Sequence, residues 1–142
     1  MTIIGIDYGR KRLGVAVSDS GHRLATPLTV IERGAAGRDL QEIRRIAEEY
    51  AAALIVLGLP VRTDGKAGDM AEETKAFGEK LREHTGLNVE FWDERFSTAQ
   101  AEKAMLGADI SRKRRREKID KVAAQIILQS YLDAQNRAQA RQ

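Results

Sequence analysis

Three acidic residues stand where the hydrophobic pattern predicts strands to end and a helix to pack. Asp7 follows the apolar run Ile3–Ile6. Glu94 follows the predicted strand Asn88–Trp92, and Asp120 lies at the margin of the apolar stripe of the last predicted helix. Carboxylates without histidine or cysteine partners suit Mg²⁺ or Mn²⁺, and two such ions can activate water and stabilise the leaving oxygen in phosphodiester cleavage. The three acids predict a metal-dependent phosphodiesterase.

Each acid also has a structural explanation, which the residues alone leave open. Asp7 could only shape the turn that follows it, and Asp93–Glu94 could only complement the positive amino end of the next helix. Asp120 could pair with a nearby basic residue such as Lys121 or Arg116. The shared position of the acids at a predicted sheet rim favours the catalytic interpretation.

Two basic clusters lie close in sequence to these acids, at residues 10–12 and 112–118. The net charge of the chain is only +3, so the positive charge is concentrated rather than general. A phosphate-backbone contact surface and a solvated, flexible loop both fit such clusters. Aromatic residues make up only 5% of the chain, which argues against a base-stacking platform. The candidates for nucleic-acid contact are Arg10, Lys11, Arg12, Arg95, Arg112, Lys113, Arg114, Arg115, Arg116 and Lys118.

The elements that must position these residues follow from hydrophobic periodicity. It predicts strands over Thr2–Tyr8, Leu13–Val17, Arg23–Ile31, Leu54–Leu57 and Asn88–Trp92, and helices over Gly37–Tyr50, Asp69–His84, Ser97–Gly107 and from Lys118 onward. A basic loop should precede the last helix. Pro27 places the third strand at a sheet edge. If the first, fourth and fifth strands are parallel, their carboxyl ends lie together, where open α/β sheets bind ligands.

Length and composition set the outer limits. The 142 residues predict one domain over residues 1–142, with a frayed polar tail from about residue 136. Hydrophobic residues account for 42% and charged residues for 32%, which excludes extended disorder. There is no cysteine, no signal-peptide pattern and no apolar run long enough to span a membrane. We therefore expect a cytoplasmic protein without a membrane partner.

Four motifs together resemble one protein family. They are IGIDYGRKRLGVAVSD, VLGLP followed by an Asp-Gly turn, DERFSTAQAE and KIDKVAAQIILQSYLD, in this order between about Ile3 and Asp133. The chain is similar to the YqgF family, also called RuvX. The resemblance implies an α/β RNase H-like fold, with a mixed five-stranded sheet in the order βββαβαβα and helices on both faces. It also implies Mg²⁺- or Mn²⁺-dependent trimming of the 5′ end of precursor 16S rRNA, with Asp7, Glu94 and Asp120 as the site.

One departure bears on the substrate. The related RuvC-type resolvases carry a second aspartate three residues after the first on the last helix, whereas this chain has Ala123 after Asp120. A resolvase also needs a two-fold dimer to cut two strands symmetrically. We therefore expect precursor rRNA rather than branched DNA as the partner, and a monomer or a weak homodimer. A junction resolvase and a non-catalytic RNA-binding assembly factor remain the alternatives. An actin-like ATPase is disfavoured because it needs two domains to clamp its nucleotide.

Overall fold

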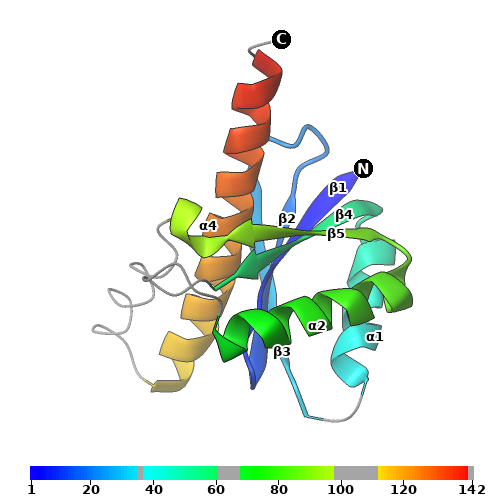
Figure 1. Ribbon diagram of the computed structural model, residues 1–142, viewed down its shortest axis with the longest axis vertical. Coiled ribbons are helices and arrows are strands. Elements are labelled where there is room, and N and C mark those ends of the chain that lie inside the picture. The colour runs from blue at the N-terminus through cyan, green and yellow to red at the C-terminus, as the bar shows by residue number, and fades with distance from the viewer. Residues whose placement is uncertain (35–36, 61–67, 98–111, 141–142) are drawn as a thin grey trace.

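The computed structural model describes residues 1–34, 37–60, 68–97 and 112–140, with side chains of the last segment described from residue 120. Figure 1 shows these elements along the chain. They are β1 (Thr2–Asp7), β2 (Arg12–Ser18), β3 (Ala25–Glu32), α1 (Arg38–Glu49), β4 (Ala52–Leu59), α2 (Asp69–Thr85), β5 (Asn88–Asp93), the short 3₁₀-helix η1 (Glu94–Phe96) and α4 (Arg112–Ala140).

The five strands form one mixed sheet in the order β3-β2-β1-β4-β5. The pairs β1–β4 and β4–β5 are parallel, whereas β1–β2 and β2–β3 are antiparallel. The strand β3, which carries Pro27, lies at the edge as predicted. The first, fourth and fifth strands are thus parallel, which is the condition for their carboxyl ends to lie together at one end of the sheet.

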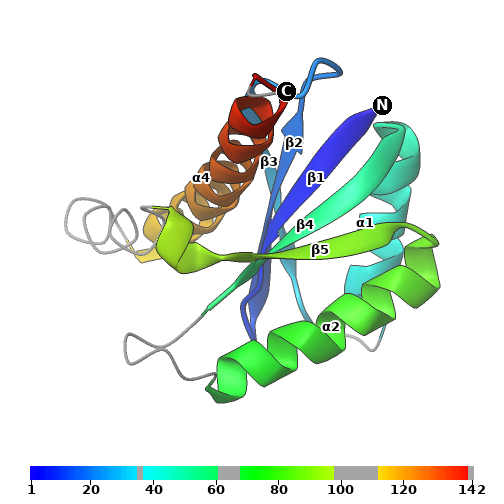
Figure 2. The ribbon, with the colours of Figure 1, turned by 45° about the horizontal axis from the view of Figure 1, so that its top comes forward.

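Helices cover both faces of the sheet, which confirms the predicted layers. Figure 2 shows α1 and α2 on one face and α4 on the other. Because side chains alternate along a strand, Ile4 and Ile6 of β1 enter the core under α1 and α2, while Ile3 enters the core under α4. Strand β1 is therefore apolar on both faces, as a central strand between two layers must be.

Two glycines allow α4 to lie directly on the sheet. A methyl group at Gly5 would lie 2.6 Å from Leu128 Cβ, and one at Gly14 would lie 2.0 Å from the main-chain oxygen of Asp120. No side chain fits between backbones at such separations. Gly14 is also the register partner of Asp7. The packing of α4 on β2 therefore fixes the Asp120 backbone at the level of Asp7.

The last helix differs from the sequence prediction at both ends. It begins at Arg112 rather than near Lys118, so the residues predicted to form a basic loop are helical. Arginine, lysine and glutamate are good helix formers, and this propensity outweighs the repulsion within the run. The helix also continues to Ala140, so residues 136–140 are not the frayed tail that the sequence predicts. Asn136 Nδ2 donates a hydrogen bond of 3.1 Å to the His22 carbonyl oxygen.

Two other predictions fall largely outside the described residues. These are the helix over Ser97–Gly107 and most of the loop containing the Asp-Gly turn. None of the helices in the described segments combines the length and apolar character that a membrane span needs.

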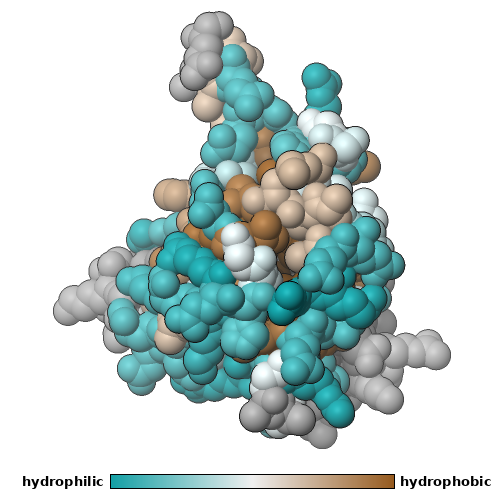
Figure 3. Space-filling view, turned by 90° about the vertical axis from the view of Figure 1, so that its right-hand side faces the viewer, coloured by the Kyte–Doolittle hydropathy of each residue, from teal (hydrophilic) through white to brown (hydrophobic). Residues whose placement is uncertain are grey.

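The surface of the molecule carries an apolar area away from the carboxyl ends of the strands. Figure 3 shows apolar side chains gathered below the end of α4, with mostly hydrophilic side chains around them. A hollow near the amino ends of β1 and β4 is lined in part by Ile3, Ala53, Leu54 and Leu132. This hollow lies at the opposite end of the parallel strands from Asp7.

Candidate functional site

Two of the predicted site acids are buried at the carboxyl ends of parallel strands. Asp7 is the last residue of β1 and is 3% exposed, and Glu94 directly follows β5 and is 4% exposed. Burial of a carboxylate is costly and is tolerated only where other groups compensate for it. Two buried carboxylates therefore lie at the same end of the sheet, and this end is the candidate functional site.

Gly58 of β4 connects these two acids in space. A methyl group at Gly58 would lie 3.3 Å from Glu94 Oε1 and 2.6 Å from Ile127 Cδ1, so the Glu94 carboxylate lies over β4 on the face covered by α4. Gly58 follows Leu57, which pairs with Ile6 of β1, so it lies beside Asp7. Asp7 points to the same face, because it lies two residues after Gly5, which contacts α4. Both carboxylates thus lie at the carboxyl ends of the parallel strands, on the face that α4 covers. This region, with Asp7, Gly58 and Glu94, is called the corner.

Asp120 reaches this region from α4, but its carboxylate is engaged elsewhere. Its Oδ2 accepts a hydrogen bond of 3.0 Å from Arg12 Nε, and the two side chains are 19% and 21% exposed. The structural explanation of Asp120, an ion pair, therefore applies, although Arg12 is the partner that the described residues supply. No local sequence pattern indicates this contact, because 108 positions separate the two residues.

The three acids do not form a ready metal site. Among the residues that the structure describes, no three histidine, cysteine, aspartate or glutamate side chains lie together as a metal-binding group. The donor chemistry of the corner still fits Mg²⁺ or Mn²⁺. These ions are usually held by one or two carboxylates, with water and substrate phosphates filling the other positions. Asp7 and Glu94 supply such a pair of carboxylates, and Gly14 and Gly58 beside them carry no side chains.

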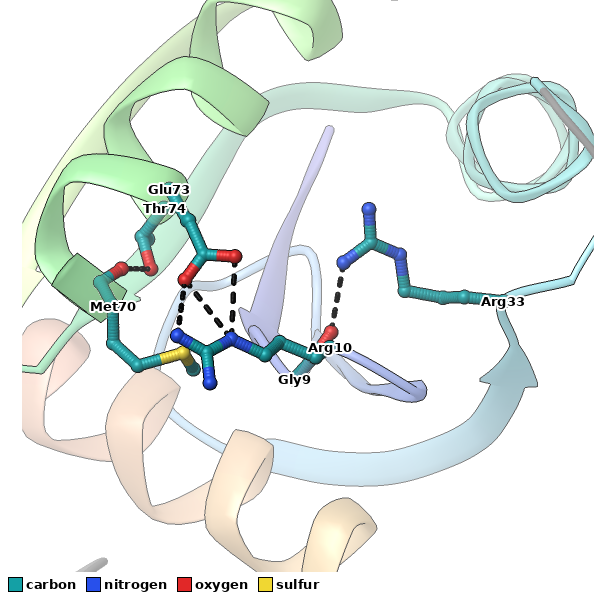
Figure 4. Close-up of polar contacts among 6 residues, drawn as sticks. All are labelled: Gly9, Arg10, Arg33, Met70, Glu73 and Thr74. Atoms are coloured by element: carbon teal, nitrogen blue, oxygen red, sulfur yellow. Dashed lines mark hydrogen bonds and ion pairs between the residues drawn. The ribbon is translucent and has the colours of Figure 1, made fainter.

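The turn between β1 and β2 is held from the opposite face of the sheet. Arg33 Nη1 donates a hydrogen bond of 2.8 Å to the Gly9 carbonyl oxygen, as drawn in Figure 4. Its Nε donates to Asp39 Oδ2 at 2.9 Å. The guanidinium carbon also lies 4.8 Å and 4.9 Å from the ring centres of Tyr8 and Phe77. Arg33 therefore fixes the segment that follows Asp7, a role that sequence analysis missed.

Arg10 ties the same turn to α2. Its Nε and Nη2 both donate to the Glu73 carboxylate, with a shortest distance of 2.7 Å (Figure 4). These hydrogen bonds raise the pKa of Arg10 and lower the pKa of Glu73. The pair is exposed, so its main effect is to orient the turn rather than to stabilise the fold.

The basic residues predicted to contact nucleic acid are placed unequally. Arg10, Arg12 and Arg95 each form an ion pair with an acid, namely Glu73, Asp120 and Asp93. Lys11 is exposed in the turn between β1 and β2. Residues 112–118 lie on the first turns of α4, and their side chains are outside the described part of the chain.

The family follows from a match over nearly the whole chain. A model of the RuvX family, described as Holliday junction resolvase, matches residues 1–134. This chain belongs to the RuvX family. A relative from Symbiobacterium thermophilum named "Putative pre-16S rRNA nuclease" is 49% identical, over 94% of this chain and 93% of the relative. A relative of the same name from Rhodobacter capsulatus is 50% identical, over 92% of this chain and 82% of the relative.

Solved structures support the RNase H-like fold expected for a RuvX chain. RuvC from Thermus thermophilus, in complex with a Holliday junction substrate, superposes with a TM-score of 0.60 at 15% identity, covering 95% of each chain. The fowlpox virus Holliday junction resolvase gives a TM-score of 0.52 at 14% identity, covering 94% of this chain and 99% of the resolvase. At these identities the similarity concerns the fold.

Proposed function

We propose that this RuvX chain is a cytoplasmic, divalent-metal-dependent endonuclease that processes the 5′ end of precursor 16S rRNA. The observation that carries the proposal is the burial of Asp7 and Glu94 on one face of the sheet, with Gly58 between them. The names of the curated relatives support the choice of RNA as substrate.

The residues divide the proposed work between holding an ion and placing the RNA. Asp7 and Glu94 would hold Mg²⁺ or Mn²⁺, with Asp120 as a further ligand. When bound, the ions supply the activated water and the stabilisation of the leaving oxygen that phosphodiester cleavage requires. Lys11, which is exposed in the turn after β1, would contact a phosphate of the RNA, as would Arg12. Gly58 lets the Glu94 and Ile127 side chains approach β4 beside Asp7, and Gly14 lets the α4 backbone at Asp120 approach β2.

The experiment compares two substrates under two metal conditions. The full-length protein is incubated with labelled precursor rRNA and with a four-way DNA junction, each with Mn²⁺ and with a chelator. We expect Mn²⁺-dependent cleavage of RNA, lost in Asp7→Asn and retained in Asp133→Asn. Asp133 is the matched control because it is an exposed aspartate on α4.

Other outcomes favour the alternatives. Preferential cleavage of the junction would make the protein a resolvase, and RNA binding without cleavage would make it an assembly factor. The structure offers no fourth carboxylate at the position that RuvC-type resolvases use, because Ala123 is 1% exposed and packs in the core under α4.

A further inference from the structure

We propose that Arg12 is a positioning residue that holds Asp120 in the metal-free protein and gives it up when a divalent ion binds. The inference rests on the proposed function, because it takes Asp120 as a ligand of that ion. Two observations carry it: Arg12 binds the Asp120 carboxylate, and the Asp120 backbone is packed against Gly14, the register partner of Asp7.

The contact between Arg12 and Asp120 has the geometry of an exchangeable pair. Only Arg12 Nε bonds the carboxylate among the described contacts. Arg10 on Glu73 and Arg95 on Asp93 instead use two nitrogens each. A guanidinium that grips a carboxylate with two parallel hydrogen bonds holds it more strongly than one that uses a single bond. Arg12 therefore holds its acid through fewer hydrogen bonds than Arg10 and Arg95 do, although its side chain is the least exposed of the three arginines.

The backbone of Asp120 does not need to move for the exchange. Its main-chain oxygen is packed against Gly14, the register partner of Asp7. The side chain can leave Arg12 by rotation about its own bonds, within a helix that stays fixed on the sheet. The rearrangement is thus confined to two half-buried side chains.

The charges of the three acids and of Arg12 determine which partner the Asp120 carboxylate takes. Asp7, Glu94 and Asp120 bring three carboxylates to one region, and like charges at close range repel each other in a partly buried site. Arg12 lowers that repulsion by neutralising Asp120 in the absence of metal. A divalent ion that binds the acids must compete with this guanidinium, so Arg12 should weaken metal binding while stabilising the metal-free fold. Once released, the guanidinium is free to accept an RNA phosphate as a partner.

The test measures Mn²⁺ affinity by electron paramagnetic resonance on the full-length protein without RNA, together with thermal melting. Arg12→Gln should bind Mn²⁺ about fivefold more tightly than the parent and melt at a lower temperature without metal. Arg12→Lys, which keeps the charge, should lie between the two. The control is Arg10→Gln, which removes one positive charge from the same turn and should change Mn²⁺ affinity by less than about twofold.

A double variant shows whether the effect passes through Asp120. In the Asp120→Asn background, Arg12→Gln should no longer change Mn²⁺ affinity. If the parent binds Mn²⁺ but Arg12→Gln leaves the affinity unchanged or weakens it, the proposal for Arg12 is wrong and the metal-dependent function stands. If the parent binds no Mn²⁺, the metal site and the role of Arg12 both fail. A loss of RNA affinity with unchanged Mn²⁺ affinity would reduce Arg12 to a phosphate contact.

Discussion

The two faces of the sheet use the same residue types differently at the carboxyl end of β1. On the face of α1 and α2, Arg33 and Arg10 are bound to Asp39 and Glu73, and both arginines hold the turn after β1. On the face of α4, Asp7 and Glu94 are buried beside Gly58. The acids on the first face bind arginines that hold the turn, whereas the second face buries two carboxylates where α4 packs closely on glycines of the sheet. The acids that are candidate metal ligands therefore differ from the structural acids in their position, because they lie at strand ends beside a glycine.

The largest expected effect is on catalysis and comes from the α4 face. Glu94→Gln keeps the size of the side chain but removes the charge that a metal ion needs. We expect RNA cleavage to fall by at least about a hundredfold, equivalent to about 2.7 kcal/mol of transition-state stabilisation. Single-turnover cleavage of labelled precursor rRNA measures this loss. Glu73→Gln is the control on the other face. Equal losses of cleavage in the two variants would contradict the assignment of different roles to the acids of the two faces.

The next largest effect concerns the packing that brings Asp120 to Asp7. Gly14→Ala would place a methyl group 2.0 Å from the main-chain oxygen of Asp120, which cannot move without shifting α4. We expect a loss of about 3 kcal/mol in the free energy of unfolding, measured by urea denaturation. Gly34→Ala is the control, because nothing lies within 4 Å of the added methyl group. An unchanged stability in Gly14→Ala would show that α4 is not seated on β2 as described.

A smaller effect is expected for the support of the turn. Arg33→Met keeps much of the packing against Tyr8 and Phe77 but removes the hydrogen bonds to Gly9 and Asp39. The free energy of unfolding should fall by about 2 kcal/mol, since Asp39 is left buried without its cation. Arg44→Met removes an exposed pair with Glu48 and should cost less than about 0.5 kcal/mol. Mn²⁺ affinity should stay unchanged in both variants, and a large change in Arg33→Met would make the turn part of the metal site.

The smallest effect is a dependence of stability on pH. Hydrogen bonds from the Arg95 side chain hold the pKa of the Asp93 carboxyl below its usual value. A carboxyl with a lowered pKa in the folded state stabilises the fold above its unfolded pKa of about 3.9, and this contribution disappears as the pH falls through the folded pKa. Between pH 6 and pH 3, the melting temperature of Asp93→Asn should therefore fall slightly less steeply than that of the parent protein. The difference should stay under about 1 kcal/mol, because Arg95 is largely exposed.

Sequence analysis predicted the fold well where local pattern carries the information. The apolar run before Asp7 and the proline in β3 correctly indicated a buried strand and an edge strand. The family resemblance added the mixed five-stranded sheet with helices on both faces. The start of α4 at Arg112 was missed, because charge repulsion was weighted above helix propensity.

The contacts that organise the candidate site were less accessible from the sequence. The pair of Arg12 with Asp120 and the fit of Gly14 against α4 join residues more than a hundred positions apart. They depend on how the last helix crosses the sheet, which no local spacing encodes. The role of Arg33 likewise depends on rings and carboxylates from β1, α1 and α2 meeting in space. The burial of Asp7 and Glu94 could be anticipated, because both follow apolar strands.

The most direct test of the central claim is the anomalous scattering of Mn²⁺ in crystals of the full-length protein soaked with the ion. The account predicts a peak between Asp7 and Glu94 on the α4 face, about 2.1 Å from a carboxylate oxygen of each residue, with the Asp120 side chain turned away from Arg12. A peak elsewhere on the molecule, or no peak at this corner at millimolar Mn²⁺, would contradict the assignment of these carboxylates as metal ligands.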